Sequence, residues 1–103
     1  MSGIIRLPDM QFVECNPAFT EISGFTPEEY IGKTPFELGL MEKPTNMNEL
    51  LDQINKDEPL RNFEPVIRTR NGQSISLLLS AQRITFESSD CILFIAHRTA
   101  GRR

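Results

Sequence analysis

The chain has 103 residues, of which 39% are hydrophobic and 24% are charged, and its formal net charge is -3. This length accommodates one folded domain, to which we assign residues 1–103. The charge balance gives no support for a nucleic-acid partner, and no apolar run approaches the ~20 residues that cross a bilayer. We therefore expect a cytosolic domain with no membrane contact of its own.

Cysteine and histidine are too scarce for the common catalytic and metal-binding constellations. The two cysteines, Cys15 and Cys91, lack the C-x-x-C spacing of zinc sites and redox dithiols, so we expect two reduced thiols. The single histidine, His97, cannot supply a multi-histidine metal site, and no Ser-His-Asp triad can be drawn without it. We predict no catalytic residue, no metal site and no enzymatic activity for this domain.

The first elements are predicted to be a β-hairpin and three short helices. Residues 3–7 and 11–15 flank a turn at Pro8-Asp9, which favours two paired strands. Three later sites combine a helix-capping residue with a proline at the first helical position, and a glycine follows each: Asn16-Pro17, Thr26-Pro27 and Thr34-Pro35. Glu29 and Glu37 lie in first turns, where an anion stabilises a helix, so we interpret them as structural carboxylates.

A longer amphipathic helix is predicted over residues 46–56. Met47, Leu50, Leu51 and Ile54 fall at the spacing i, i+3, i+4 and i+7, which places them on one face of a helix. Polar residues occupy the remaining positions. We therefore expect one side of this helix to be buried.

From residue 60 the pattern changes to β-strands, at residues 63–70, 74–81 and 91–97. Asn71-Gly72 predicts a two-residue turn with positive φ at both central positions, and residues 87–90 are predicted as a polar turn. Pro65 cannot donate a hydrogen bond to a neighbouring strand, which places its strand at a sheet edge. The last strand is apolar on both faces, which predicts a central strand covered on both sides.

Two groups of motifs resemble those of the PAS domain family. Residues 16–19 resemble N-x-A-F, and residues 24–33 resemble G-[YF]-[ST]-x-E-E-x-x-G-[KR]. Residues 68–72 are similar to R-x-[KR]-[DN]-G, and residues 79–84 and 91–93 are similar to S-A-x-x-I and C-x-L. The resemblance implies an α+β fold, with a five-stranded antiparallel sheet in the order 2-1-5-4-3 and with short helices and one longer helix on one face.

The resemblance also implies a regulatory sensor module of a larger bacterial signal-transduction protein, such as a two-component histidine kinase or a diguanylate cyclase. Such a module would bind a small apolar molecule between the sheet and the long helix, or relay a signal received elsewhere, and would mediate dimerisation. Each pocket candidate could instead simply pack the core. The candidates are Phe19, Ile22, Tyr30, Phe36, Leu50, Leu51, Ile54, Ile67, Leu77 and Leu79.

Two residues with which PAS family members bind a cofactor have no counterpart in this sequence, so no cofactor is evident. The cysteine with which photoreceptor members form a flavin adduct has no counterpart in residues 32–38. The histidine that haem-binding members carry on the long helix has none in residues 47–56. We therefore expect neither a flavin adduct nor a haem.

The end of the last strand is expected to carry the output signal. PAS modules commonly end this strand with Asp-Ile-Thr, which helps to couple the domain to the effector that follows. The matching residues are His97, Arg98 and Thr99, so a histidine stands in place of the usual aspartate. We expect residues 99–103 to begin an exit linker, with an effector domain C-terminal to Arg103.

A ligand-free module for protein–protein interaction and dimerisation is the alternative function. Because the helices of such a fold cover one face of the sheet, either residues 91, 93 and 95 or residues 92, 94 and 96 must lie on its outer side. An uncovered apolar row marks a partner surface, so we expect a homodimer through this face. Alternatively, long side chains such as Arg68 and Arg83 could lie over the row and shield it.

Overall fold

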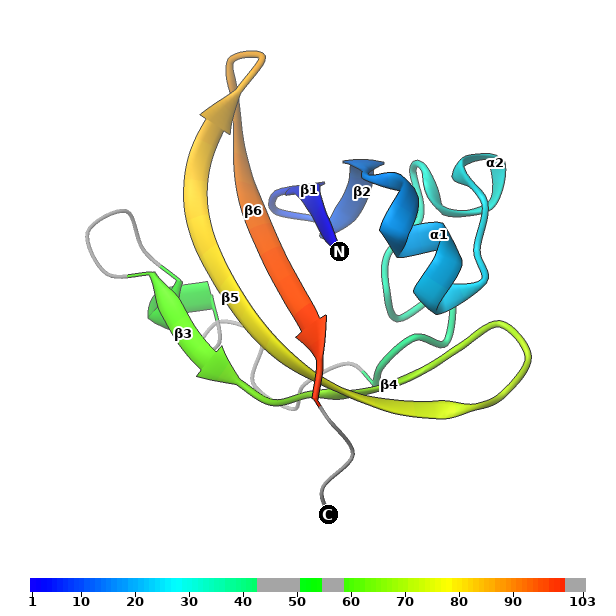
Figure 1. The fold of residues 1–103 in the computed structure, drawn as a ribbon. Helices are drawn as coiled ribbons and strands as arrows, with labels where there is room; N and C mark the ends of the chain where they lie inside the picture. The colour runs from blue at the N-terminus through cyan, green and yellow to red at the C-terminus, as the bar shows by residue number, and fades with distance from the viewer. Residues whose placement is uncertain (43–50, 55–58, 100–103) are drawn as a thin grey trace.

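The fold is an antiparallel β-sheet with helices on one side (Figure 1). The computed structural model describes residues 1–42, 51–54 and 59–99. The strands run in the order β2-β1-β6-β5-β3, and β4 also pairs with β5, which confirms the predicted fold class and strand order. The elements are β1 (Ser2–Arg6), β2 (Gln11–Cys15), α1 (Pro17–Ser23), α2 (Pro27–Tyr30), β3 (Leu60–Phe63), β4 (Val66–Arg68), β5 (Ser74–Phe86) and β6 (Ser89–Arg98).

The predicted third strand, residues 63–70, is instead two short strands, β3 and β4. The chain leaves the ladder at Glu64 and Pro65, because Pro65 has no N–H to donate. The Pro65 carbonyl instead accepts the N–H of Leu77 at 2.9 Å. Both short strands pair with β5 at the end of the sheet, which confirms the edge position predicted from Pro65.

The turn between β4 and β5 is longer than the two-residue turn predicted from Asn71-Gly72. Only Gly72 has a positive φ, 89°. The Thr69 N–H donates to the Gln73 carbonyl at 2.8 Å, so three residues form the loop. The Thr69 side chain favours this geometry, because its hydroxyl donates to Asn71 Oδ1 at 2.6 Å and accepts the Gln73 N–H at 3.1 Å.

The hairpin of β5 and β6 extends further than the sequence indicated, and the predicted four-residue polar turn is wrong. Ten residue pairs connect the two strands, from Leu77 with Arg98 to Phe86 with Ser89. Glu87 and Ser88 alone form the turn, with φ of 51° and 65°. Positive φ at both central residues matches the right-handed twist of the strands, so pairing can continue to the end of the hairpin.

Two of the three short helices form as predicted, and the third does not. Residues 35–39 form turns: the Leu38 N–H donates to the Thr34 carbonyl at 3.2 Å, and Gly39 then has a φ of 77°. The left-handed residue stops the chain before a second helical bond can form. In the predicted long helix, residues 51–53 are helical, whereas Met47 and Leu50 lie outside the described residues.

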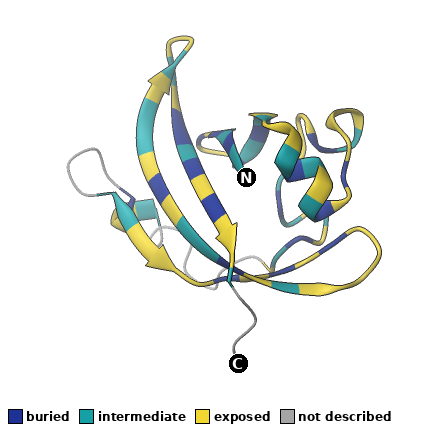
Figure 2. Cartoon of the chain, viewed as in Figure 1, coloured by how far each residue is buried: buried dark blue, intermediate teal, exposed yellow. Residues whose placement is uncertain are grey.

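Alternation along β6 divides the sheet into an inner face, toward the helices, and an outer face (Figure 2). Ile92, Phe94 and Ala96 are buried in the core on the inner face. Residues 91, 93 and 95 therefore lie on the outer face, where Ile95 is 47% exposed, so the prediction of cover on both sides is wrong there. Arg83 is paired with Ile92 and so belongs to the inner face, which excludes it as a shield for the outer row.

The cysteines lie on opposite faces of the sheet. A Cβ atom on Gly3 would approach both Cys15 Sγ, at 2.6 Å, and the Phe94 ring, at 2.8 Å, which places Cys15 with Phe94 on the inner face. Cys91 lies on the outer face and is fully buried there by its neighbours. Both thiols are free, as predicted.

Glu29 ties the short helix α2 to the β4–β5 hairpin. Its Oε1 accepts a hydrogen bond from the Thr26 N–H at 2.9 Å, and its Oε2 accepts one from the Arg70 Nε–H at 2.8 Å. The Arg70 N–H in turn donates to the Ser23 carbonyl at 2.8 Å. The hydrogen bond from Thr26, followed by the Arg70 guanidinium, lowers the pKa of Glu29 below its ordinary value of 4.5.

We predict that Glu29→Gln lowers the melting temperature at pH 7 but has little effect near pH 2. A carboxylate with a lowered folded pKa stabilises the protein above its unfolded pKa, and this stabilisation is lost as the pH falls through the folded value. Thermal unfolding of both proteins at pH 7 and pH 2 measures the difference. Glu28→Gln, in the same helical turn, is the matched control, and an equal deficit of the Glu29 variant at both pH values would contradict the assignment.

Candidate functional site

An apolar cavity of about 100 Å³ lies between the inner face of the sheet and the helical side of the molecule. Aliphatic, aromatic and thioether side chains surround it, and none of its described lining residues is charged. The lining residues are Met1, Ile5, Met10, Phe12, Phe19, Pro35, Leu40, Met41, Ile54, Leu60, Phe63, Pro65, Ile67, Leu77, Leu79, Ala81, Ile92 and Phe94.

The structure places half of the predicted pocket residues at this cavity. The five that line it are Phe19, Ile54, Ile67, Leu77 and Leu79. Tyr30 is buried beside it in the core, and Phe36 and Leu51 pack against the core while remaining partly exposed. Ile22 borders a separate surface hollow with Glu21 and Arg70, and Leu50 lies outside the described residues.

Sequence reasoning did not select the cavity residues of the first hairpin and the central strand. Ile5 and Phe12 face each other across β1 and β2, and Phe94 on β6 lies opposite Gly3. Their alternation with polar or outward residues is the signal that could have identified them. Met10 could not be found in this way, because it lies in a turn with a φ of 65° rather than in a strand.

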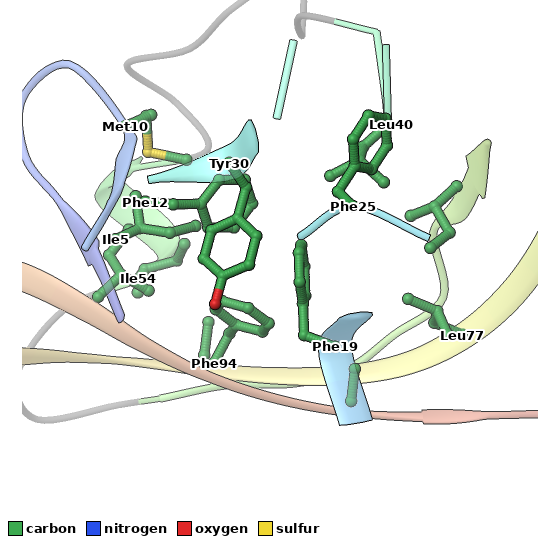
Figure 3. Packing of buried hydrophobic residues seen from close by; sticks show 14 of the residues in the cluster. Ile5, Met10, Phe12, Phe19, Phe25, Tyr30, Leu40, Ile54, Leu77 and Phe94 are labelled. Atoms are coloured by element: carbon green, nitrogen blue, oxygen red, sulfur yellow. The ribbon is translucent and has the colours of Figure 1, made fainter. Parts of the chain in front are cut away.

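Four aromatic rings, those of Phe12, Phe19, Tyr30 and Phe94, pack together beside the cavity, and all but Tyr30 line it (Figure 3). The ring centroids of Phe19 and Tyr30 lie 4.8 Å apart, and those of Phe12 and Phe19 lie 5.2 Å apart. Phe94 completes the group at 6.2 Å from Phe12 and 6.4 Å from Phe19. Most of these pairs meet edge to face, the arrangement that the ring quadrupoles favour, so the cluster packs α1 and α2 firmly against the sheet.

The polar atoms nearest this cluster belong to Tyr30 and Cys15. The Tyr30 hydroxyl donates to the Cys15 carbonyl at 3.4 Å. Burial raises the pKa of the Cys15 thiol to about 12, and burial also raises the pKa of Tyr30. Both groups are therefore neutral at physiological pH, so neither brings charge to the apolar interior.

The described ranges contain neither a cluster of metal-ligating side chains nor a membrane-spanning helix. Residues 1–42, 51–54 and 59–99 bring no three side chains of His, Cys, Asp or Glu together as a metal site. Within the same ranges, no helix is long and apolar enough to cross a membrane.

The predicted output residues lie where β6 leaves the sheet (Figure 1). His97 and Arg98 are exposed. Thr99 is held against the start of β5, because its N–H and its hydroxyl approach the Ser76 carbonyl at 3.1 and 3.4 Å. The exit of the chain is thus fixed to the same hairpin that contributes Leu77 and Phe94 to the cavity.

A protein-family model and several solved structures indicate the same fold for this chain. A family model described as the PAS fold matches residues 3–99. The PAS domain of an HTR-like protein from Haloarcula marismortui superposes with a TM-score of 0.82, at 24% identity over 96% of this chain and 80% of that one. A LOV protein from Rhodobacter sphaeroides gives 0.76, at 16% identity over 99% of this chain and 61% of that one. No curated protein matched the sequence.

A structure reported in a flavin-analogue study of the light-oxygen-voltage (LOV) domain mechanism gives a TM-score of 0.73. Its identity to this chain is 13%, over 97% of this chain and 77% of that one. At this identity the likeness concerns the fold.

We predict that neither thiol reacts rapidly with an aromatic disulfide reagent at pH 8 while the protein is folded. Cys15 is held protonated and Cys91 is inaccessible to solvent. After unfolding in guanidinium chloride, both cysteines of the chain should react without prior reduction. Fast reaction in the folded state would contradict the placement of the thiols, and an unreactive pair after unfolding would indicate a disulfide.

Proposed function

This chain belongs to the PAS family, and on that premise we propose that it is the ligand-sensing module of a larger signalling protein. PAS domains are regulatory modules of signalling proteins, and the match covers nearly the whole chain. A histidine kinase or a diguanylate cyclase is the parent that we propose, with its effector C-terminal to Arg103. The observation that carries the sensing role is the apolar cavity, which is built partly from the strand that leads to the exit of the chain.

The proposed guest is a small, uncharged and apolar molecule. A buried charge without a partner would be strongly unfavourable among these side chains, whereas an apolar guest gains the contacts that an empty space lacks. Apolar cavities of roughly 150 Å³ in other proteins stay dry and bind benzene. A volume of about 100 Å³ therefore suits a guest of one small ring or a short hydrocarbon after slight movement of the walls.

The size and lining of the described cavity favour a guest other than flavin. Sites for cofactors and drug-sized ligands typically occupy about 300–1,000 Å³ and carry a few polar groups that orient the ligand. This cavity is about 100 Å³, and its described lining offers no hydrogen-bonding side chain for the polar edge of a flavin. These features support a guest other than flavin and a non-covalent mode of binding.

Strand β6 provides a direct route from the cavity to the output residues. Ile92 and Phe94 line the cavity, and His97 follows only three residues after Phe94. A guest that displaces the Phe94 ring would shift the strand, because paired strands move together rather than bend at one residue. The hydrogen bonds of Thr99 to Ser76 would then pass this shift to the chain beyond.

Self-association is a second proposed role, and the outer face favours it. Ile95 is 47% exposed on the central strand of the sheet, beside partly buried Leu93. Exposed apolar residues grouped in this way mark contact surfaces. Guest binding on the inner face and dimerisation on the outer face are compatible, whereas a ligand-free dimerisation module would use the outer face alone.

We predict that benzene stabilises the wild-type protein and that Ala81→Leu removes this effect. Ala81 is buried and lines the cavity, so the larger side chain would occupy the space of the guest. A guest present at one hundred times its Kd adds about 2.7 kcal/mol to the free energy of unfolding. Chemical unfolding across a benzene titration measures this shift.

The matched control is Ser76→Leu, which adds a leucine at an exposed position of the same strand. This variant should retain the benzene-dependent stabilisation. Equal stabilisation of the wild type and Ala81→Leu would show that benzene acts elsewhere. No stabilisation of any of the three proteins would contradict a guest site for small apolar molecules and leave the ligand-free module as the proposed function.

A further inference from the structure

Phe63 is the most exposed residue of the cavity wall. It is 37% exposed, whereas the other described lining residues are buried or half-buried. Phe63 ends β3, the last strand of the order β2-β1-β6-β5-β3, so within the described residues no strand pairs with the far side of β3 (Figure 1). Solvent therefore reaches the cavity wall most fully at Phe63, on the edge of the sheet.

A β-bulge directs the Phe63 side chain into the cavity. Two residues separate Leu60 from Phe63 on β3, whereas one residue separates their partners on β5. The extra residue is accommodated at Asn62, which has a φ of 57°. Side chains three residues apart on a regular strand point to opposite faces, but the bulge brings Leu60 and Phe63 to the same one. Both line the cavity, as do their partners Ala81 and Leu79.

The Phe63 ring can turn outward at little cost to the rest of the fold. The chain leaves the ladder directly after Phe63, at Glu64 and Pro65, so the ring lies at the end of an edge strand. Rotation about its side-chain bonds breaks no backbone hydrogen bond. Side chains of exposed residues change rotamer within picoseconds to nanoseconds. An open and a closed position of the ring therefore interchange rapidly.

The opposite edge of the sheet offers no comparable opening. There α1 contacts β1 and α2 contacts β2. Phe12 and Phe19 line the cavity on this side, and both are buried, with ring centroids 5.2 Å apart. A guest that entered here would have to separate the rings that hold the short helices to the sheet. At Phe63 only one side chain has to move.

We propose that Phe63 is the gate of the cavity, past which a small apolar guest enters and leaves. In the closed position its ring covers the cavity at the edge of the sheet, and in the open position the ring is turned toward solvent. The gate rests on the guest-binding role proposed above. It adds the route of entry and the residue that controls how fast the guest exchanges.

A gate and an ordinary lining contact differ in their effect on the rate constants of binding. A guest associates only while a gate is open, so the closed position lowers the association rate constant in proportion to the open fraction. An ordinary contact stabilises the bound guest, and its loss raises the dissociation rate constant alone. The association rate constant therefore distinguishes the two roles of Phe63.

Truncation of the ring tests the gate. We expect Phe63→Ala to raise the association rate constant of benzene about tenfold or more, because the minor state of a two-state protein is about 0.1–10% populated. Phe63→Leu is a milder truncation and should raise it by a smaller factor, so either variant tests the gate. Exchange spectroscopy with isotope-labelled benzene gives the dissociation rate constant. Its ratio to the Kd, from an unfolding titration of the same variant, is the association rate constant.

Val66→Ala is the matched control. Val66 on β4 is also an exposed apolar residue at this end of the sheet, but it is not among the residues that line the cavity. Its variant should keep the wild-type association rate constant. A rise as large as that of Phe63→Ala would indicate general loosening and overturn the gate.

The measurement separates failure of the gate from failure of the guest site. If the variants of Phe63 bind benzene but associate no faster than the wild type, the gate is wrong and the guest site stands. If benzene binds to none of the proteins, the guest site and the gate are both overturned.

Discussion

The four-ring aromatic cluster is the contact on which the rest of this molecule depends. Phe12 and Phe94 contribute to the cluster from the sheet, and Phe19 and Tyr30 contribute from the helices. The ring contacts therefore hold the short helices in one position on the inner face. Helices of four and seven residues are too short to be stable alone, and tertiary packing must hold them. Gly3 is part of this arrangement, because any side chain there would strike the Phe94 ring.

The cluster also explains why a cavity remains next to it. Large rigid rings packed edge to face do not fill space as flexible aliphatic chains do. The cavity lies next to them, and the β5–β6 hairpin, which contributes to its lining, is curved (Figure 1). Methionines at positions 1, 10 and 41 border that space with side chains that can adjust to a guest. The inner face therefore combines a rigid end, which holds the fold, with an adaptable end suited to a small apolar molecule.

The sequence was informative wherever one residue type permits one conformation. Pro65 indicated a sheet edge, and Gly24 ended α1 in the left-handed conformation as expected. The sequence was less informative where two local geometries are possible and side-chain hydrogen bonds decide between them. In the β4–β5 turn, the hydrogen bonds of the Thr69 hydroxyl stabilise the longer loop. The cavity was only partly predictable, because Met10 reaches it from a turn and Leu79 from a strand, and no single period connects them.

The central claim is that β6 connects a guest in the cavity with the exit of the chain at Thr99. Amide chemical shifts recorded during a titration with benzene test it most directly. The account predicts that the amides of Phe94, His97 and Thr99 shift together and saturate along one binding curve. Shifts that saturate at Phe94 while those of His97 and Thr99 stay constant would contradict it.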